Sequence, residues 1–148
     1  MSLKPRVFID ADVLFAGSAS PTQHGVSHVV LRMAEITLVE AITSRQVITE
    51  AERNLTEKLP DKLAEFRLIV SRCLRVVPDP SPDDLEPYES QADHKDLPIL
   101  VAALREWCAH LLTFNLRHFH PTGKSITVQR PGDFLLTVRG LLTSLSSQ

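Results

Sequence analysis

The sequence of 148 residues is long enough for one domain with a sizeable core. Its hydrophobic fraction of 43% and charged fraction of 23% are ordinary for a globular protein, and its net charge of -2 gives no overall basic signature. No apolar run approaches the roughly 20 residues of a membrane span, and Asp10 and Asp12 interrupt the first apolar run, which argues against a signal peptide. We therefore expect a single cytoplasmic domain over residues 1–148, with no membrane segment.

The first predicted strand, residues 6–10, carries an apolar run that leads directly into Asp10. A continuous apolar run of this length is typical of a strand buried on both faces. Ligands of open parallel sheets bind outside the carboxyl ends of the strands, so Asp10 is well placed for chemistry. Asp12 follows two residues later, and both acids also fit a simpler role in shaping a turn or capping the next helix.

Helical and strand-like segments alternate along the rest of the chain. Pro21 and Gly25 mark a loop, and residues 38–42 fit either a strand or a continuation of the preceding helix. Ser44 and Asp96 are candidate N-caps. Helices are expected at 26–34, 45–59, 61–73 and 96–107 and from 131 onward, strands at 75–77, 110–113 and 125–128, and a proline-rich acidic loop at 78–90. The alternation predicts an α/β fold with a mainly parallel sheet.

Three acids and one amide stand at comparable places in these elements. Asp10 ends the first strand, and Glu50 lies in the first turns of the 45–59 helix. Asp96 opens the 96–107 helix, and Asn115 follows the 110–113 strand. Strand carboxyl ends and helix amino ends share one edge of a parallel sheet, so the four side chains could converge there. Clustered carboxylates need a cation, and oxygen ligands suit Mg²⁺ or Mn²⁺, which serve phosphoryl chemistry.

Each candidate also fits a structural role. Asp96 could serve only as an N-cap, Glu50 as a solvated helix residue and Asn115 as a turn residue. His118 and His120 raise the alternative of a zinc site, but no cysteine or histidine partner stands at ligand spacing. His118 fits better as a group at the rim of a pocket, where it could touch a phosphate.

The order of these motifs resembles that of the PIN-domain ribonuclease family. The resemblance extends over nearly the whole chain and rests on five segments. They are Phe8-Ile9-Asp10-Ala11-Asp12-Val13-Leu14, Ser44-x5-Glu50-x3-Asn54-Leu55, Asp96-x2-Ile99-Leu100-x-Ala102-Ala103, Leu112-Thr113-Phe114-Asn115-Leu116-x2-Phe119 and Pro131-Gly132-Asp133-Phe134-Leu135. The resemblance implies a three-layer α/β/α fold and an acidic pocket that holds Mg²⁺ or Mn²⁺.

For activity, the resemblance implies cleavage of single-stranded RNA. It also suggests the toxin of a toxin–antitoxin pair, with an antitoxin protein as its partner. A homodimer is expected as well, for which the helices at 26–35 and 61–73 offer apolar faces.

The resemblance assigns the family's site roles to individual residues of this sequence. Asp10, Glu50 and Asp96 match the catalytic metal-site acids. Asn115 matches the fourth catalytic position, which is often Asp in relatives, so the expected site carries less negative charge. Asp12 stands where relatives often have Asn, and could add a nearby carboxylate as a supporting residue.

Other side chains complete the expected site. Thr113 is expected to support it by orienting the pocket through its hydroxyl group. Binding of RNA requires cations, and several arginines and a lysine lie on segments near the expected edge. They are Arg45, Arg53, Arg105, Arg117 and Lys124.

Together with the predicted acidic site, the resemblance implies a divalent-metal-dependent endoribonuclease that leaves 5′-phosphate and 3′-hydroxyl ends. One alternative is a catalytically weak or inactive module of the same fold that binds RNA or protein, which the reduced charge at Asn115 favours. Another is a receiver domain phosphorylated on Asp10, although the lysine expected at the end of a late strand is missing.

Overall fold

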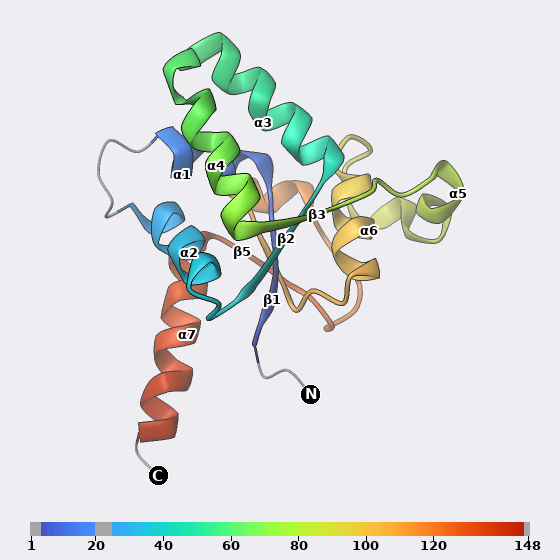
Figure 1. Ribbon diagram of the computed structural model, residues 1–148. Coiled ribbons are helices and arrows are strands. Elements are labelled where there is room, and N and C mark those ends of the chain that lie inside the picture. The colour runs from blue at the N-terminus through green and yellow to red at the C-terminus, as the bar shows by residue number, and fades with distance from the viewer. Residues whose placement is uncertain (1–3, 20–24, 147–148) are drawn as a thin grey trace.

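Five strands form one parallel sheet in the computed structural model, which describes residues 4–19 and 25–146 (Figure 1). They are β1 (Arg6–Ile9), β2 (Glu40–Ser44), β3 (Leu74–Val77), β4 (His110–Leu112) and β5 (Thr127–Gln129). Their order across the sheet is β3-β2-β1-β4-β5, and every neighbouring pair is parallel. The predicted α/β class is confirmed. The order differs from the 2-1-3-4-5 order of flavodoxin-like receivers, so the receiver alternative is wrong.

Helices cover both faces of this sheet. They are α1 (Ala11–Ala19), α2 (Val26–Glu35), α3 (Arg45–Lys58), α4 (Leu63–Cys73), α5 (Pro82–Leu85), α6 (Leu97–Arg105) and α7 (Pro131–Ser146). The chain runs from β1 through β2 to β3 in one direction and then returns across the sheet to β4. Because such crossovers are right-handed, α1 to α4 lie on one face and α6 on the other. Figure 1 shows this three-layer arrangement, with α7 beside α2.

The central strand β1 explains why the apolar run precedes the first acid. Val7, Phe8 and Ile9 are fully buried, because β2 and β4 flank the strand and helices cover both of its faces. The chain then turns at Asp10 into α1. The sequence pattern does not indicate α1, because this helix is apolar around most of its circumference and therefore shows little helical periodicity.

Several boundaries differ from the predicted ones for local reasons. Residues 38–42 were ambiguous, and β2 begins at Glu40. Ser44 caps α3 as predicted, since its hydroxyl oxygen accepts a hydrogen bond from the Val47 N–H. The expected loop at 78–90 contains α5, stabilised by a capping box between Ser81 and Asp84, and a 3-10 helix at Glu86–Gln91. The predicted loop marker Pro21 lies outside the described residues.

The sheet has a topological switch point between β1 and β4. From β1 the chain continues to β2 and β3 on one side of that strand. It then crosses back over the sheet to β4, which lies on the other side of β1. In open α/β sheets a ligand crevice forms at such a point, beyond the carboxyl ends of the strands. None of the described helices is both long and apolar enough to cross a lipid bilayer.

Candidate active site

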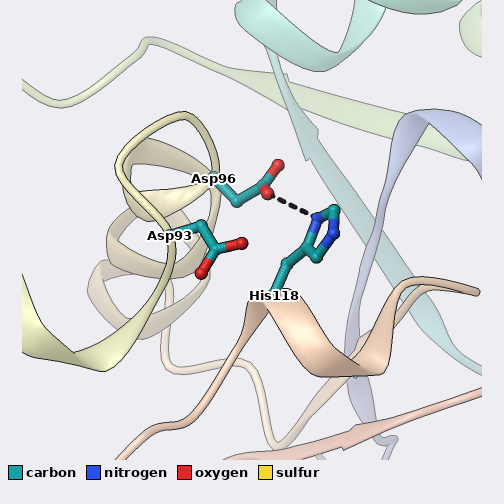
Figure 2. A group of neighbouring side chains, drawn as sticks. All are labelled: Asp93, Asp96 and His118. Carbon is teal, nitrogen blue, oxygen red and sulfur yellow. Dashed lines mark hydrogen bonds and ion pairs between the residues drawn. The ribbon is translucent and has the colours of Figure 1, made fainter.

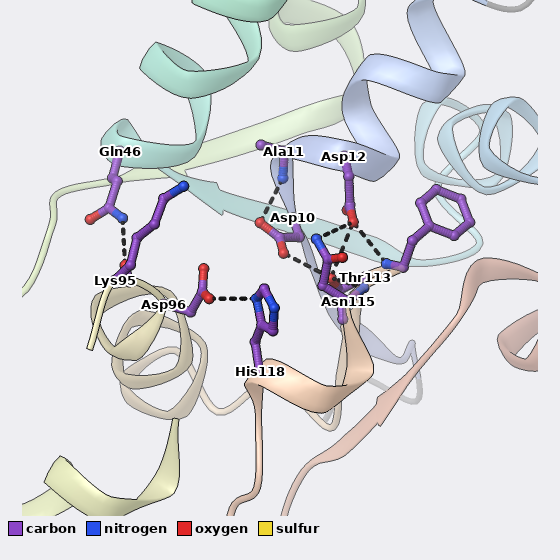
Figure 3. Close-up of polar contacts among 10 residues, drawn as sticks. Asp10, Ala11, Asp12, Gln46, Lys95, Asp96, Thr113, Asn115 and His118 are labelled. Atoms are coloured by element: carbon purple, nitrogen blue, oxygen red, sulfur yellow. Dashed lines mark hydrogen bonds and ion pairs between the residues drawn. The ribbon is translucent and has the colours of Figure 1, made fainter. Parts of the chain in front are cut away.

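A polar cavity of about 210 Å³ lies at this switch point. We call it the acidic cavity, and its lining residues are Asp10, Asp12, Glu50, Asn54, Lys95, Asp96, Asn115 and His118. The four side chains expected to converge, Asp10, Glu50, Asp96 and Asn115, all line it (Figure 3 shows three of them). Their convergence follows from the parallel sheet, which brings strand ends and helix starts to one edge.

Asp10 is fixed by two hydrogen bonds at the end of β1. Its Oδ1 accepts the Ala11 N–H at 2.7 Å, and its Oδ2 accepts the Thr113 hydroxyl at 2.8 Å. Thr113 is fully buried just past the end of β4. The hydroxyl of Thr113 therefore connects the ends of the two strands that flank the switch point, and sets the orientation of the Asp10 carboxylate.

Asp12 bridges the first turn of α1 to the segment that follows β4. Its Oδ2 accepts the Phe114 N–H at 2.9 Å and the Asn115 side-chain amide at 3.2 Å, and it lies 3.4 Å from the Thr113 hydroxyl (Figure 3). Its Oδ1 is buried and has no hydrogen-bond partner among the described residues. A buried carboxylate oxygen without a partner is costly unless a ligand satisfies it.

Burial and like charge together disfavour ionisation of these acids. Burial, and after it the charge of Asp12, raise the pKa of Asp10 to about 7, although the hydrogen bonds from Ala11 and Thr113 act in the opposite direction. A smaller upward contribution to the pKa of Asp10 comes from Glu50. Burial also raises the pKa of Asp12. The ionised forms of these carboxylates are therefore destabilised in the folded protein, and a bound cation would stabilise them.

This donor set fits a hard divalent cation. Asp10, Asp12, Glu50 and Asp96 supply carboxylate oxygens to one small cavity, with only Lys95 as an opposing fixed cation. The unpartnered Oδ1 of Asp12 and the raised pKa of Asp10 are both features that a bound Mg²⁺ or Mn²⁺ would stabilise. The described residues that line the cavity include no cysteine, and His118 is their one histidine.

Asp96 carries its carboxylate away from the helix that it begins. It occupies the N-cap position of α6, but its side chain makes no cap hydrogen bond. Instead its Oδ2 lies 2.9 Å from Nδ1 of His118, which belongs to the 3-10 turn Leu116–His118 (Figure 2). The alternative that Asp96 serves only as a cap is therefore wrong.

Asp93, Asp96 and His118 form a small group of their own. One ligand atom from each lies within 4.8 Å of the others, so this group could also hold a metal ion (Figure 2). Asp96 belongs both to this group and to the acidic cavity, which places His118 beside the expected metal site. His120 does not line the acidic cavity.

A family model described as the PIN domain matches residues 6–117, most of the chain. The chain belongs to the PIN-domain family. This confirms the resemblance found in the sequence, and it accounts for the three-layer fold. No curated protein matches the sequence of this PIN domain.

Solved structures similar to this PIN domain include two from toxin–antitoxin systems. VapC20 of Mycobacterium tuberculosis, a toxin that cleaves the sarcin–ricin loop, is 17% identical with a TM-score of 0.52, over 73% of this chain and 88% of that one. VapBC2 of Rickettsia felis, bound to a DNA fragment from its promoter, is 14% identical with a TM-score of 0.59, over 84% of this chain and 98% of the other. At such low identity, the likeness shows the fold that these proteins share with the chain.

Three residues at the PIN domain's site were given no site role from the sequence, although one of them, Asn54, belongs to a segment that carries the family resemblance. Asn54 follows Glu50 by one helical turn, and that spacing could have placed it on the same face of α3. Lys95 and Asp93 stand one and three residues before Asp96, in a turn whose geometry the sequence pattern did not indicate. Two expected cations lie elsewhere: Arg105 pairs with Asp84 near the end of α6, and Lys124 belongs to the loop that enters β5 from the opposite edge.

Proposed function

We propose that this PIN domain is a divalent-metal-dependent endoribonuclease that cleaves single-stranded RNA. The observation that carries the proposal is the convergence of the carboxylates of Asp10, Glu50 and Asp96 in one cavity at the switch point of the sheet. Such a cluster has little structural purpose, because burial of Asp10 near the charges of Asp12 and Glu50 raises its pKa and costs stability. Membership of the PIN-domain family supports the same activity.

Asp10, Glu50 and Asp96 would hold Mg²⁺ or Mn²⁺, with Asp12 as a nearby fourth carboxylate. When bound, such an ion lowers the pKa of water and stabilises charge on a phosphoryl group. Among the protein's own groups, Glu50 or Asp96 accepts the proton from the attacking water. Water adds to the phosphorus as the bond to the 3′-oxygen breaks, and the departing 3′-oxygen takes a proton from solvent, which yields 5′-phosphate and 3′-hydroxyl ends.

The biological setting that we propose is a toxin–antitoxin pair in the cytoplasm, with this PIN domain as the toxin. The support is the structural likeness to VapC20 and to VapBC2, the second of which is a complex of two proteins with promoter DNA. An antitoxin protein would then be the partner that keeps the nuclease inactive. Co-expression with the neighbouring gene product, followed by purification of a complex, tests this part.

A homodimer is also part of the proposal. The apolar faces of α2 and α4, which the sequence suggested for the dimer, are largely buried within the protomer. Val30 and Leu31 of α2 and Phe66 of α4 all lie in the core. Val26 and Leu68 remain exposed on these helices, and the C-terminal half of α7 also exposes several leucines. Light scattering should give about twice the protomer mass of 16.5 kDa, and a protomer mass at high concentration would reject the dimer.

A module that binds RNA without cutting it is the second candidate. The observation in its favour is Asn115, an uncharged amide that donates its hydrogen bond to Asp12 and adds no charge to the cavity. Incubation of the purified protein with mixed RNAs, in Mn²⁺ or in chelator, decides between the two. Fragments with 5′-phosphate ends in Mn²⁺ alone support the nuclease, whereas intact RNA that remains bound supports the module.

A further inference from the structure

A second polar cavity, of about 460 Å³, adjoins the acidic cavity along α3. We call it the α3 groove, and its lining residues are Gln46, Thr49, Glu50, Arg53, Asn54, Asp79 and Lys95. Glu50, Asn54 and Lys95 line both hollows. The α3 groove is therefore a lateral extension of the candidate active site rather than a separate site.

The walls of the α3 groove are fixed by the fold. Positions 46, 49, 50, 53 and 54 lie on one face of α3, while Val47, Ala51 and Leu55 of the same helix are buried. Asp79 accepts the Gln46 N–H at 2.9 Å, and the carbonyl oxygen of Lys95 accepts the Gln46 side-chain amide at 3.3 Å (Figure 3). The helix, the segment after β3 and the turn before α6 are thus held at the groove.

The cations of the α3 groove are free to bind an anion. Arg53 and Lys95 have no ion-pair partner among the described residues, and they come from two different segments, α3 and the turn before α6. By contrast, Arg67 lies 3.7 Å from Glu52 and Arg105 lies 3.3 Å from Asp84. The side chains of Thr49 and Asn54 also make no hydrogen bond to other described residues, so they offer further hydrogen bonds to a ligand.

We infer that the α3 groove binds the phosphate next to the scissile phosphate of an RNA strand, between Arg53 and Lys95. This inference rests on the proposed function. A polyanion that approaches the acidic cavity meets Asp10, Asp12 and Asp96, so attraction must come from cations beside that cavity. No aromatic side chain lines the groove, so bases are not stacked there and the contact is to the RNA backbone.

The binding test uses Arg53→Gln, which removes one charge from an exposed position of α3. Anisotropy of a labelled single-stranded RNA of mixed sequence is measured with Mn²⁺ in an Asp96→Asn background, so that the RNA is not cut. We expect Arg53→Gln to weaken binding roughly 3- to 10-fold and to lower the slope of log Kd against log salt by about 0.7, the loss of one phosphate contact. Arg32→Gln, whose arginine pairs with Glu35 at 2.8 Å on α2, is the matched control and should change neither.

A scan with neutral methylphosphonate linkages identifies the contact. At one linkage beside the cleavage position, the neutral linkage should weaken binding to the Arg32→Gln control clearly more than binding to Arg53→Gln, because one of the two cationic partners of that phosphate is already absent in Arg53→Gln. Unchanged affinity and salt slope in Arg53→Gln would overturn the inference. An equal loss of RNA affinity at every linkage would also overturn the inference. The inference would fail as well if Arg53→Gln weakened only the binding of a protein partner.

The same measurements separate this inference from the proposed function. If RNA binding depends on Arg53 but wild-type protein cuts no RNA in Mn²⁺, the nuclease activity fails and the phosphate contact stands. If wild-type protein cuts RNA and Arg53→Gln binds and cuts it normally, the α3 groove is not the phosphate site and the nuclease stands.

Discussion

The side-chain amide of Asn115 donates a hydrogen bond to Oδ2 of Asp12 at 3.2 Å, so an uncharged group and a carboxylate face each other at the switch point. By resemblance to the PIN-domain family, Asp is common at the position of Asn115 and Asn is common at that of Asp12. Compared with such relatives, this protein therefore has the amide and the carboxylate in exchanged positions. The cavity still receives a fourth carboxylate, from α1 instead of from the segment after β4.

Replacing Asn115 with Asp should make the protein less stable without metal and tighter in its binding of Mn²⁺. The new carboxylate would face Asp12 where a hydrogen bond now exists, which costs about 1 to 3 kcal/mol of unfolding free energy. With Mn²⁺ the added charge becomes favourable. Urea unfolding in chelator and calorimetric titration with Mn²⁺ measure both effects, and unchanged stability in chelator would contradict the pairing with Asp12.

The double variant Asp12→Asn with Asn115→Asp should recover most of the stability lost in Asn115→Asp. It restores one amide and one carboxylate in contact, although Phe114 N–H must then be accepted by an amide oxygen. A double-mutant cycle in chelator gives the coupling between the two positions, which we expect to be about 1 kcal/mol or more. Purely additive effects would show that the two side chains act independently.

Stability of the metal-free protein should fall as the pH rises, because folding raises the pKa of Asp10 from 3.8 to about 7. The folded state holds this proton more tightly than the unfolded chain, so its stability is lost between those two values. Between about pH 5 and pH 8, the loss should be about 3 kcal/mol in unfolding free energy. Asp10→Asn can still accept the Ala11 N–H on its amide oxygen, while its NH2 group would donate to the Thr113 hydroxyl oxygen instead of accepting from it. This variant should show a much smaller fall, and an equal fall in the two proteins would rule out Asp10 as its source.

Replacing Asp96 with Asn should abolish cleavage and preserve the fold. The Asp96 side chain makes no cap hydrogen bond to α6, and an amide oxygen can still accept a hydrogen bond from His118. The unfolding free energy should change by less than about 1 kcal/mol, while the cleavage rate falls about 100-fold or more. An unfolded variant would assign Asp96 a structural role, and normal cleavage would remove it from the active site.

The sequence predicted the architecture well where a buried pattern determines it. The apolar run before Asp10 marks a strand covered on both sides, and Ser44 marks the start of α3. The pattern failed at α1, which is apolar on most sides, and at α5, where Pro82 and several acids suggested a loop. Periodicity describes amphipathic elements, so a helix that is apolar on most sides and a single-turn helix both escape it.

The convergence of Asp10, Glu50, Asp96 and Asn115 was predictable because parallel strands present their carboxyl ends at one edge. The contacts among the side chains were not. That Asp12 meets Asn115, and that His118 meets Asp96, depends on how the turns after β4 fold back toward α1 and α6. Residues 12 and 115 are distant in the sequence, and no local pattern indicates their contact.

The measurement that tests the account most directly is the RNA cleavage rate as a function of Mn²⁺ concentration, beside calorimetric titration of the same protein with Mn²⁺. In the wild-type protein, cleavage should be absent in chelator and should reach half its maximum at the Mn²⁺ concentration that half-saturates the site. Asp10→Asn should lose both the cleavage and the calorimetric signal. Cleavage that continues in chelator, or that proceeds at the wild-type rate in Asp10→Asn, would contradict the assignment of the acidic cavity as a metal-dependent nuclease site.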